Sequence, residues 1–368
     1  MVNRHRQRPG VDGEDGIYRR GVDPETEKKL PLAFPLYLSH SSAVSVGGSQ
    51  DVTPQNTEET FELITNTEVP AFHEPSAPAH ITHRTWRLAD FVAIPEVLNG
   101  ENKALVGDLG CALEKIRTDL CPTFFEEKLG ISLNVDGFLG RRITDFAAGY
   151  LLEKAVFEAY IIMNLDSAAA EAANVSEKDL LTPQEAKERS LAAQYHLESE
   201  VIYLEYSGTF GGDEAVSFLE SIDDGVSWSK LWYGGGLDDR ENVRAVLDAG
   251  ADAVVVGNVF HDIAAEEAAL FEQAREEFDS VPEDLTEWVA DTVDAGETAA
   301  ARYLSTTTEV PNPERRAVRY LATGIEFALH VDALAAEFSE PDAATIEGKL
   351  RLALTGDHPF GAALDGDS

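Results

Sequence analysis

The segment from residue 201 to residue 258 contains three strings of one kind: VIYLEYSG (201–208), KLWYGGG (230–236) and ADAVVVGN (251–258). Each string is a run of mostly apolar, β-favouring residues that ends in glycine or asparagine. Runs that are apolar on both faces are typical of buried parallel strands, and the polar stretches that separate them have the spacing of helices. The segment therefore predicts consecutive βα units.

The same pattern extends towards the N-terminus. Further strands are predicted at 43–46, 69–72, 91–94 and 159–163, which gives seven βα units between about residue 40 and residue 275. Helix starts with a capping threonine before proline, at Thr53-Pro54 and Thr182-Pro183, support these units. Residues 16–22 are the candidate for an eighth strand. Eight units predict an α/β fold, a (β/α)₈ TIM barrel, rather than an open doubly wound sheet, and neither GxGxxG nor a Walker lysine motif is present.

The pattern also divides the chain. We expect a flexible N-terminus at 1–15, the barrel at 16–278, and a helical extension at 279–368 whose end is disordered. Helical periodicity in the extension covers about 284–303, 313–338 and 342–354. The unusually long segment 117–150 predicts an additional helix or a lid.

The charge of the chain excludes several partners. The 29 Lys+Arg and 67 Asp+Glu give a net charge of −38, which would repel nucleic acid and anionic lipid surfaces. Ten lysines and an acidic surface are expected of a protein adapted to high salt, and an ordinary acidic cytosolic protein is the alternative. The two cysteines, Cys111 and Cys121, predict neither a disulfide framework nor a zinc site. With no apolar signal segment and no run long enough to span a membrane, we expect a cytoplasmic protein.

Glycines at the ends of three consecutive strands indicate a phosphate site. In a TIM barrel, phosphate commonly binds at the loops after strands seven and eight, which here contain Gly234-Gly235-Gly236 and Gly257-Asn258. Ser207 and Gly208 extend the same edge from strand six. Because glycine lets backbone N–H groups approach an anion closely, we expect a phosphate cradle, with simple turn glycines as the alternative.

Four motifs, taken together, resemble those of a known protein family. YLEYSG (203–208), YGGG (233–236), ADAVVVGN (251–258) and GGSQDVT (47–53) closely resemble the geranylgeranylglyceryl phosphate synthase family, which includes the bacterial heptaprenylglyceryl phosphate synthases. The resemblance covers about residues 17–265. It implies a TIM-barrel prenyltransferase that joins a polyprenyl diphosphate to sn-glycerol 1-phosphate with Mg²⁺, the first ether bond of archaeal membrane lipids.

The resemblance also implies roles for individual residues. Asp23, which lies 24 residues before Gly47 as the family's strand-one aspartate does, would hold Mg²⁺ together with Ser49. Glu205 would orient or deprotonate the attacking hydroxyl. We expect small-molecule substrates and a homo-oligomer. The residues that would bind glycerol phosphate are Tyr203, Leu204, Glu205, Tyr206, Ser207, Gly208, Gly236, Gly257 and Asn258.

One position departs from the family pattern. The lysine expected two residues before Asp23 is Gly21, and the histidine just upstream is Tyr18. Arginine at 19 or 20 lies at a different register and is not a simple replacement. Two alternatives therefore stay open: a paralogue with another small phosphorylated acceptor, and a weakly active homologue that acts as a scaffold or regulatory subunit.

Two further patterns have both a functional and a structural interpretation. His73-Glu74, His80 and His83 have the composition of a metal site but not the HExxH spacing, and a polar rim of the active site is favoured over a metal. The apolar residues of 111–125 either line a prenyl tunnel or form ordinary core.

Overall fold

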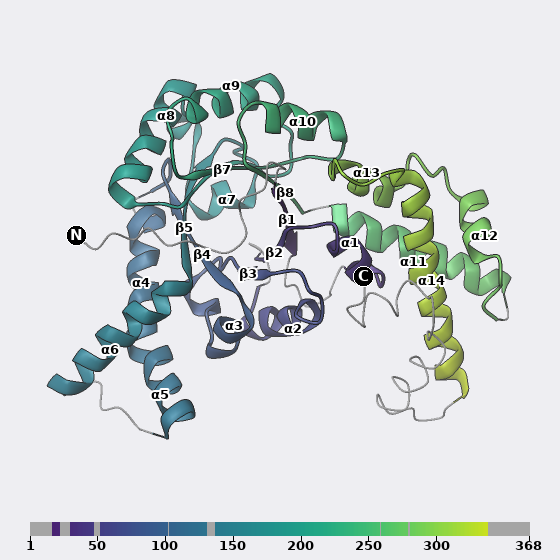
Figure 1. Ribbon diagram of the computed structural model, residues 1–368, viewed down its shortest axis with the longest axis horizontal. Helices are drawn as coiled ribbons and strands as arrows, with labels where there is room; N and C mark the ends of the chain where they lie inside the picture. The colour runs from purple at the N-terminus through teal and green to yellow at the C-terminus, as the bar shows by residue number, and fades with distance from the viewer. Residues whose placement is uncertain are drawn as a thin grey trace.

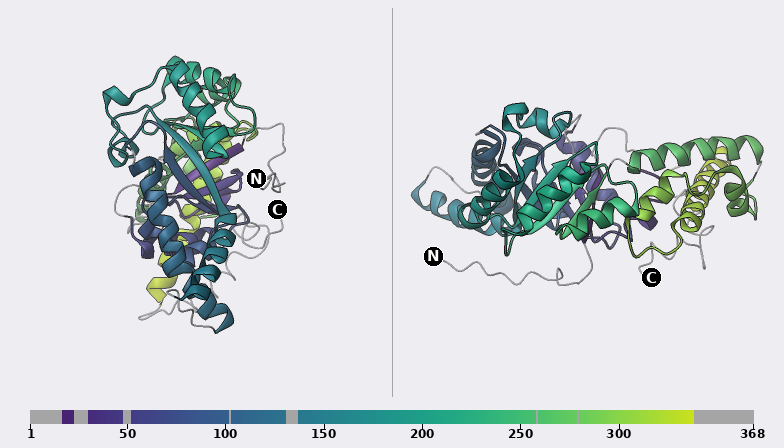
Figure 2. Two further views of the ribbon diagram at one scale, coloured as in Figure 1. Left: turned by 90° about the vertical axis from the view of Figure 1, so that its left-hand side faces the viewer. Right: turned by 90° about the horizontal axis from the view of Figure 1, so that it is seen from above.

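The computed structural model describes residues 17–22, 30–47, 52–101, 103–130, 137–257, 259–278 and 280–337. It has a barrel of parallel strands at its centre and a group of helices at one end, which makes the molecule elongated (Figures 1 and 2). Among the described helices, none is both long enough and apolar enough to cross a membrane.

Eight parallel strands close into a barrel in sequential order. The expected first strand at 16–22 is confirmed, because β1 pairs with β8 on one side and with β2 on the other. The predicted (β/α)₈ fold is therefore correct. The strands are β1 (Ile17–Val22), β2 (Ala43–Val46), β3 (Ala71–His73), β4 (Phe91–Val97), β5 (Ala155–Ile162), β6 (Val201–Tyr206), β7 (Lys230–Gly235) and β8 (Ala253–Val256).

Helices cover the outside of this barrel (Figure 1). Their starts agree with the capping signals: the Thr53 hydroxyl accepts from the Asn56 N–H at 3.1 Å, and Thr182 forms a capping box with Glu185. The helices of the barrel region are α1 (Phe34–Leu38), α2 (Pro54–Ile64), α3 (His83–Leu88), α4 (Asp108–Lys115), α5 (Cys121–Leu129), α6 (Phe138–Leu151), α7 (Ala168–Ala172), α8 (Pro183–Ala192), α9 (Gly212–Asp223), α10 (Arg240–Asp248) and α11 (Val259–Glu277). Short 3₁₀ or π turns are η1 (Pro78–His80), η2 (Lys103–Gly107), η3 (Ile116–Leu120), η4 (Leu152–Lys154), η5 (Glu177–Asp179) and η6 (Ala193–Leu197).

The long segment between β4 and β5 forms helices, as its length suggested. α4, η3 and α5 follow one another without a break, α6 packs against η3 and α5, and α5 and α6 project from the barrel (Figure 1). Side chains of this segment, Ile116 among them, form a separate apolar cluster with Trp86 of α3 and Val92 of β4. The segment is therefore an elaboration of the fourth βα unit and not a loose loop.

The C-terminal extension consists of α12 (Leu285–Thr292), α13 (Ala299–Thr306) and α14 (Pro313–Glu337). The prediction of one helix over 284–303 is wrong, because the chain turns at 293–298. There the Asp294 carboxylate accepts from the Gly296 N–H at 3.2 Å, and the Thr298 hydroxyl caps the next helix. Both are local side-chain bonds that compete with helix continuation. The predicted helix at 342–354 lies outside the described residues.

The extension shares one hydrophobic core with the barrel. Tyr37 of α1 makes edge-to-face contacts with Phe260, Tyr303 and Tyr320, at centroid distances of 6.3, 5.6 and 5.1 Å respectively. The Tyr303 hydroxyl also donates to the Tyr37 carbonyl at 2.9 Å. Because these side chains come from α1, α11, α13 and α14, the extension is part of the barrel's packing rather than an independent domain.

Candidate active site

A cavity of about 770 Å³ opens at the C-terminal ends of the barrel strands. One side of it is polar and glycine-rich, with Gly208, Gly236 and Gly257 from the loops after β6, β7 and β8. The other side is apolar and is formed by β4, α4 and α7. The apolar lining residues there are Ile81, Ile94, Pro95, Val97, Ala104, Leu109, Ala112, Ala168, Ala169, Ala172 and Ala173.

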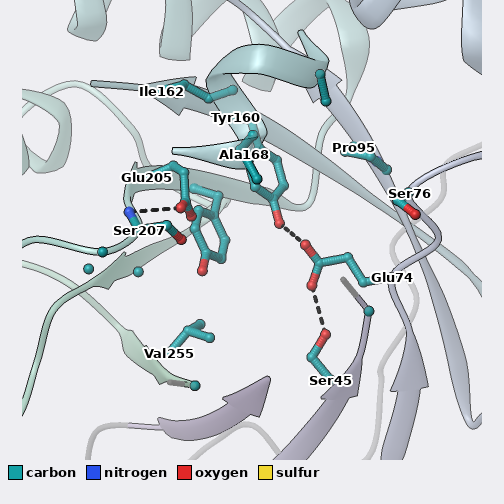
Figure 3. A pocket seen from close by; sticks show the side chains of 18 of the residues that line it. Ser45, Glu74, Ser76, Pro95, Tyr160, Ile162, Ala168, Glu205, Ser207 and Val255 are labelled. Atoms are coloured by element: carbon teal, nitrogen blue, oxygen red, sulfur yellow. Dashed lines mark hydrogen bonds between the residues drawn. The ribbon is translucent and has the colours of Figure 1, made fainter. Parts of the chain in front are cut away.

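Strand β6 places its side chains alternately inside and outside the barrel. Tyr203 lines the cavity. Glu205 lines it too, and Ser207 follows at the strand end (Figure 3). Leu204 and Tyr206 face the helices instead: Leu204 is fully buried in the main core, and the Tyr206 hydroxyl donates to Glu214 at 2.9 Å. The side chains of these last two predicted residues therefore do not reach the cavity. The two-residue period of a strand is the reason.

Glu205 is a buried carboxyl group at the floor of the cavity, with 4% of its surface exposed. Its carboxylate accepts from the Ser207 N–H at 2.9 Å (Figure 3). The pKa of Glu205 is raised to about 7, chiefly by burial; hydrogen bonds from Ser207 oppose this rise, and the nearby Glu74 carboxyl contributes to it. A carboxyl group with such a pKa can accept a proton near neutral pH.

The glycines of β7 are required by close contacts. A Cβ on Gly234 would lie 2.0 Å from the Tyr203 hydroxyl, and one on Gly235 would lie 2.4 Å from the Tyr233 hydroxyl. The Gly236 N–H donates to the Thr209 carbonyl at 2.8 Å, so this group joins two loops. Gly236 itself lines the cavity, and its contact with a phosphate stays a prediction.

Glu74 is a cavity residue whose role the motif analysis missed. Its carboxylate accepts from the Ser45 hydroxyl at 2.7 Å and from the Tyr160 hydroxyl (Figure 3). The Tyr160 ring stacks on Tyr203 with centroids 4.4 Å apart, so the network reaches the strand that carries Glu205. The His73-Glu74 pair at a strand end is the sequence signal for this position, and the predicted polar rim includes Glu74.

The histidines near Glu74 do not form a metal site with it. His73 points out of the barrel against Phe61 and is 1% exposed, and burial lowers its pKa to about 3. Within the described ranges, no cluster of three or more His, Cys, Asp or Glu side chains is arranged to hold a metal ion. Glu74 lines the cavity and His73 does not, and the preference for a polar rim over a metal stays a prediction.

The segment 111–125 contributes to both the cavity and the core. Ala112 lines the apolar side of the cavity, together with Leu109 from the same helix. Ile116 and Cys121 are buried in the cluster between α4, α5 and α6. Apolar walls of this kind can hold a hydrocarbon chain and exclude water from the reacting atoms.

Three predicted residues, Asp23, Ser49 and Asn258, lie outside the described residues. The strands that lead to the first two are described: Val22 at the end of β1 pairs with Val46 at the end of β2. Gly21 also lies on β1, opposite Ser45.

Comparison with known protein families shows to which family this chain belongs. A family model described as the PcrB family matches residues 18–275. The chain belongs to the PcrB family. The match spans the PcrB barrel from β1 to α11 and ends before α12, so the α12–α14 extension lies beyond it.

Two relatives of this PcrB-family chain have curated names. The chain is 27% identical over 222 residues to geranylgeranylglyceryl phosphate synthase of Haloquadratum walsbyi, which covers 60% of this chain and 77% of that protein. It is 28% identical over 243 residues to heptaprenylglyceryl phosphate synthase of Listeria innocua, which covers 66% and 90%. Both names agree with the resemblance of the motifs.

A solved structure with a related name is that of (S)-3-O-geranylgeranylglyceryl phosphate synthase from Thermoplasma acidophilum in complex with sn-glycerol-1-phosphate. Its sequence identity to this chain is 17%, and its TM-score is 0.48. It covers 67% of this chain and 87% of that one.

Proposed function

We propose that this protein is a cytoplasmic prenyltransferase that joins a geranylgeranyl or other polyprenyl diphosphate to sn-glycerol 1-phosphate. The observation that carries the proposal is one cavity with two unlike sides and Glu205 between them. The glycine-rich side suits a small phosphorylated acceptor, and the apolar side suits a prenyl chain. Membership of the PcrB family and the names of the two relatives support the same reaction.

The proposed reaction exchanges one carbon–oxygen bond for another and transfers one proton. The hydroxyl oxygen of glycerol phosphate attacks the first carbon of the prenyl chain, and the bond from that carbon to the diphosphate oxygen breaks. Pyrophosphate leaves with the bonding electrons, and Glu205 accepts the hydroxyl proton. The stacked rings of Tyr160 and Tyr203 would keep water away from the allylic carbon, because both line the cavity.

Magnesium is a further part of the proposal. One carboxylate and one hydroxyl, from Asp23 and Ser49, suit an ion that keeps water and diphosphate oxygens among its ligands. The pairing of Val22 with Val46 supports this pair, because Asp23 and Ser49 follow those residues along the chain. When bound, Mg²⁺ would neutralise charge on the leaving pyrophosphate.

A second candidate keeps the donor and changes the acceptor to another small phosphate ester. It is favoured by Gly21, which supplies no cation from β1 where the family pattern has a lysine. A scaffold or regulatory role is the remaining alternative. The position of Glu205 argues against that role, because its carboxyl group lines a large cavity beside the glycine-rich loops, at the place where a substrate would bind.

The deciding experiment incubates the protein with labelled sn-glycerol 1-phosphate and a panel of prenyl diphosphates, in high salt with Mg²⁺. We expect a lipid-soluble labelled product, and none after Mg²⁺ is removed with a chelator. sn-Glycerol 3-phosphate and dihydroxyacetone phosphate, run in parallel, test the second candidate. A folded protein that forms no product with any pair contradicts both enzyme candidates.

A further inference from the structure

The side chains that line the cavity carry more acidic than basic groups, which is unusual for a site that binds anionic substrates. Its ionisable carboxyl side chains are Glu74, Glu205, Asp238 and Asp262, whereas Arg302 is the one lysine or arginine among the described lining residues. Both proposed substrates are phosphorylated anions. Unless a cation offsets these carboxylates, an incoming phosphate would be repelled from the glycine-rich side.

Arg302 comes from the extension and not from the barrel. It lies on α13, beyond the part of the chain that matches the PcrB family. In the cavity lining it accompanies Gly257, Val259 and Asp262, which belong to the loop after β8 and to α11. α13 packs against α11, where the Ala300 N–H donates to the Glu266 carboxylate at 3.5 Å, so Arg302 lies beside the helix that follows the β8 loop.

The helix that carries Arg302 is anchored to the barrel. Its opposite face, with Ala300 and Tyr303, is fully buried. The chain after α13 is held by the Arg240 guanidinium of α10, which donates to three carbonyls. These belong to Ser305, Thr307 and Val310, at 3.1, 3.3 and 2.9 Å. The position of Arg302 is thus set by packing and by hydrogen bonds at the C-terminal end of the helix.

The guanidinium of Arg302 is also available. Arg302 is exposed, and its side chain donates to the Glu297 carbonyl at 3.3 Å. Within the described part of the chain, no carboxylate lies within ion-pair distance of it. An arginine that keeps most of its donors in a chain of net charge −38 is suited to a doubly charged phosphate, which a guanidinium can bind through two hydrogen bonds.

We propose that Arg302 binds the phosphate of the acceptor and takes the place of the cation that β1 lacks at Gly21. This inference rests on the proposed function. It makes the helical extension a part of the active site, and it assigns the acceptor's phosphate to the space between Arg302 and the loops after β7 and β8.

The test compares Arg302→Gln and Arg302→Lys with the wild-type chain and with Arg319→Gln. Arg319 is a matched control because it is an exposed arginine of the same extension that does not line the cavity. Melting temperature and circular dichroism of all four proteins, in the lowest salt that keeps them folded, establish that the fold is unchanged. The kinetic readout is the KM for each substrate.

We expect Arg302→Gln to raise the KM for sn-glycerol 1-phosphate by about 10- to 100-fold, the effect of losing charge-assisted hydrogen bonds. The KM for the prenyl diphosphate should change much less, Arg302→Lys should recover part of the loss, and Arg319→Gln should behave as wild type. An unchanged acceptor KM in Arg302→Gln, or an increase confined to the donor KM, would overturn the inference while leaving the proposed function intact.

Calorimetric titration separates this inference from failure of the proposed function. If the wild-type chain forms no product, the proposed function fails, and titration with inorganic phosphate alone tests Arg302. Weaker phosphate binding in Arg302→Gln than in Arg319→Gln then supports the anion site. Equal binding, or no binding by the wild-type chain, overturns it.

Discussion

At the scale of single residues, Glu205 shows how an environment changes the chemistry of a common side chain. A solvated glutamate is almost fully ionised at neutral pH, whereas burial raises the pKa of Glu205 to about 7. Tyr203, Tyr160 and Glu74 form the rest of this environment through ring stacking and a hydrogen bond. The proposed base is therefore poised to gain or lose a proton in the physiological range.

Replacement of Glu205 by glutamine should lower kcat by about 10²- to 10⁴-fold, the usual effect of losing a general base. In the wild-type enzyme, kcat/KM should increase as the pH rises through about 7, because only the ionised carboxylate accepts a proton. A pH–rate profile of both proteins measures this. A wild-type rate that is flat between pH 6 and pH 8, or an active Glu205→Gln variant, would contradict the role of Glu205.

The raised pKa of Glu205 also predicts that the stability of the fold depends on pH, and this effect can be measured separately from catalysis. Since the folded pKa is raised from 4.5 to about 7, the folded state holds a proton that the unfolded state has released, and stability falls as pH rises through that interval. The loss amounts to roughly 3 kcal/mol. Burial also raises the pKa of Glu96 to about 7, but Glu96 does not line the cavity. Glu96→Gln should remove a similar pH dependence of melting temperature and keep the activity.

At the scale of elements, the contact between α11 and α14 depends on one glycine. A Cβ on Gly324 would lie 2.0 Å from a carboxylate oxygen of Glu267. That carboxylate also accepts from the N–H groups of Leu32 and Ala33, and Glu267 is 4% exposed. Glu267 thus joins α11 to the start of α1 and cannot move away without losing these bonds.

Gly324→Ala should therefore destabilise the protein, by roughly 1–3 kcal/mol, as overpacking of a core does. The matched control is Gly110→Ala on α4, where a Cβ meets no atom within 4 Å. Alanine there should be neutral or stabilising by up to about 1 kcal/mol, because it favours helix. Chemical denaturation of the three proteins measures the difference. A Gly324→Ala variant as stable as Gly110→Ala would show that α11 and α14 do not approach this closely.

At the scale of the whole molecule, the hydrophobic core stabilises the folded state and the net negative charge destabilises it. The core is continuous from the barrel to α14, whereas the net charge of −38 favours expansion of the chain. The Lys187–Asp224 and Lys230–Asp252 salt bridges each have one exposed partner, so each contributes little to stability. Screening by salt is then the main means of reducing the repulsion.

We expect the melting temperature to rise steeply between about 0.1 M and about 3 M potassium chloride, because the Debye length falls from about 10 Å to a few ångströms. Sucrose is the control, since it favours the compact state without screening charge. Thermal melts followed by circular dichroism in both series test adaptation to high salt. Equal stability at the two salt concentrations, or equal effects of sucrose and salt, would contradict it.

Local signals in the chain are enough to predict the barrel. Short β-branched runs that end at glycine, such as Ala253–Val256, favour buried strands, and threonine caps such as Thr53 and Thr182 start helices through bonds within one turn. Even the first strand was predicted, because seven strands were expected after residue 40 and the barrel needs eight. The glycines at strand ends likewise marked the edge of the barrel where the cavity opens.

Which of these residues share the cavity depends on how the strands close into the barrel. Tyr203 and Glu205 point inwards, and Leu204 and Tyr206 point outwards. The sequence does not show which face of the strand is which, because both faces are largely apolar. The Tyr160 hydroxyl donates to the Glu74 carboxylate, although the two residues lie 86 positions apart in the sequence. Arg302 reached the glycine-rich edge because α13 packs on α1 and α11. Contacts between distant segments depend on how whole elements pack, and no local pattern in the chain encodes that packing.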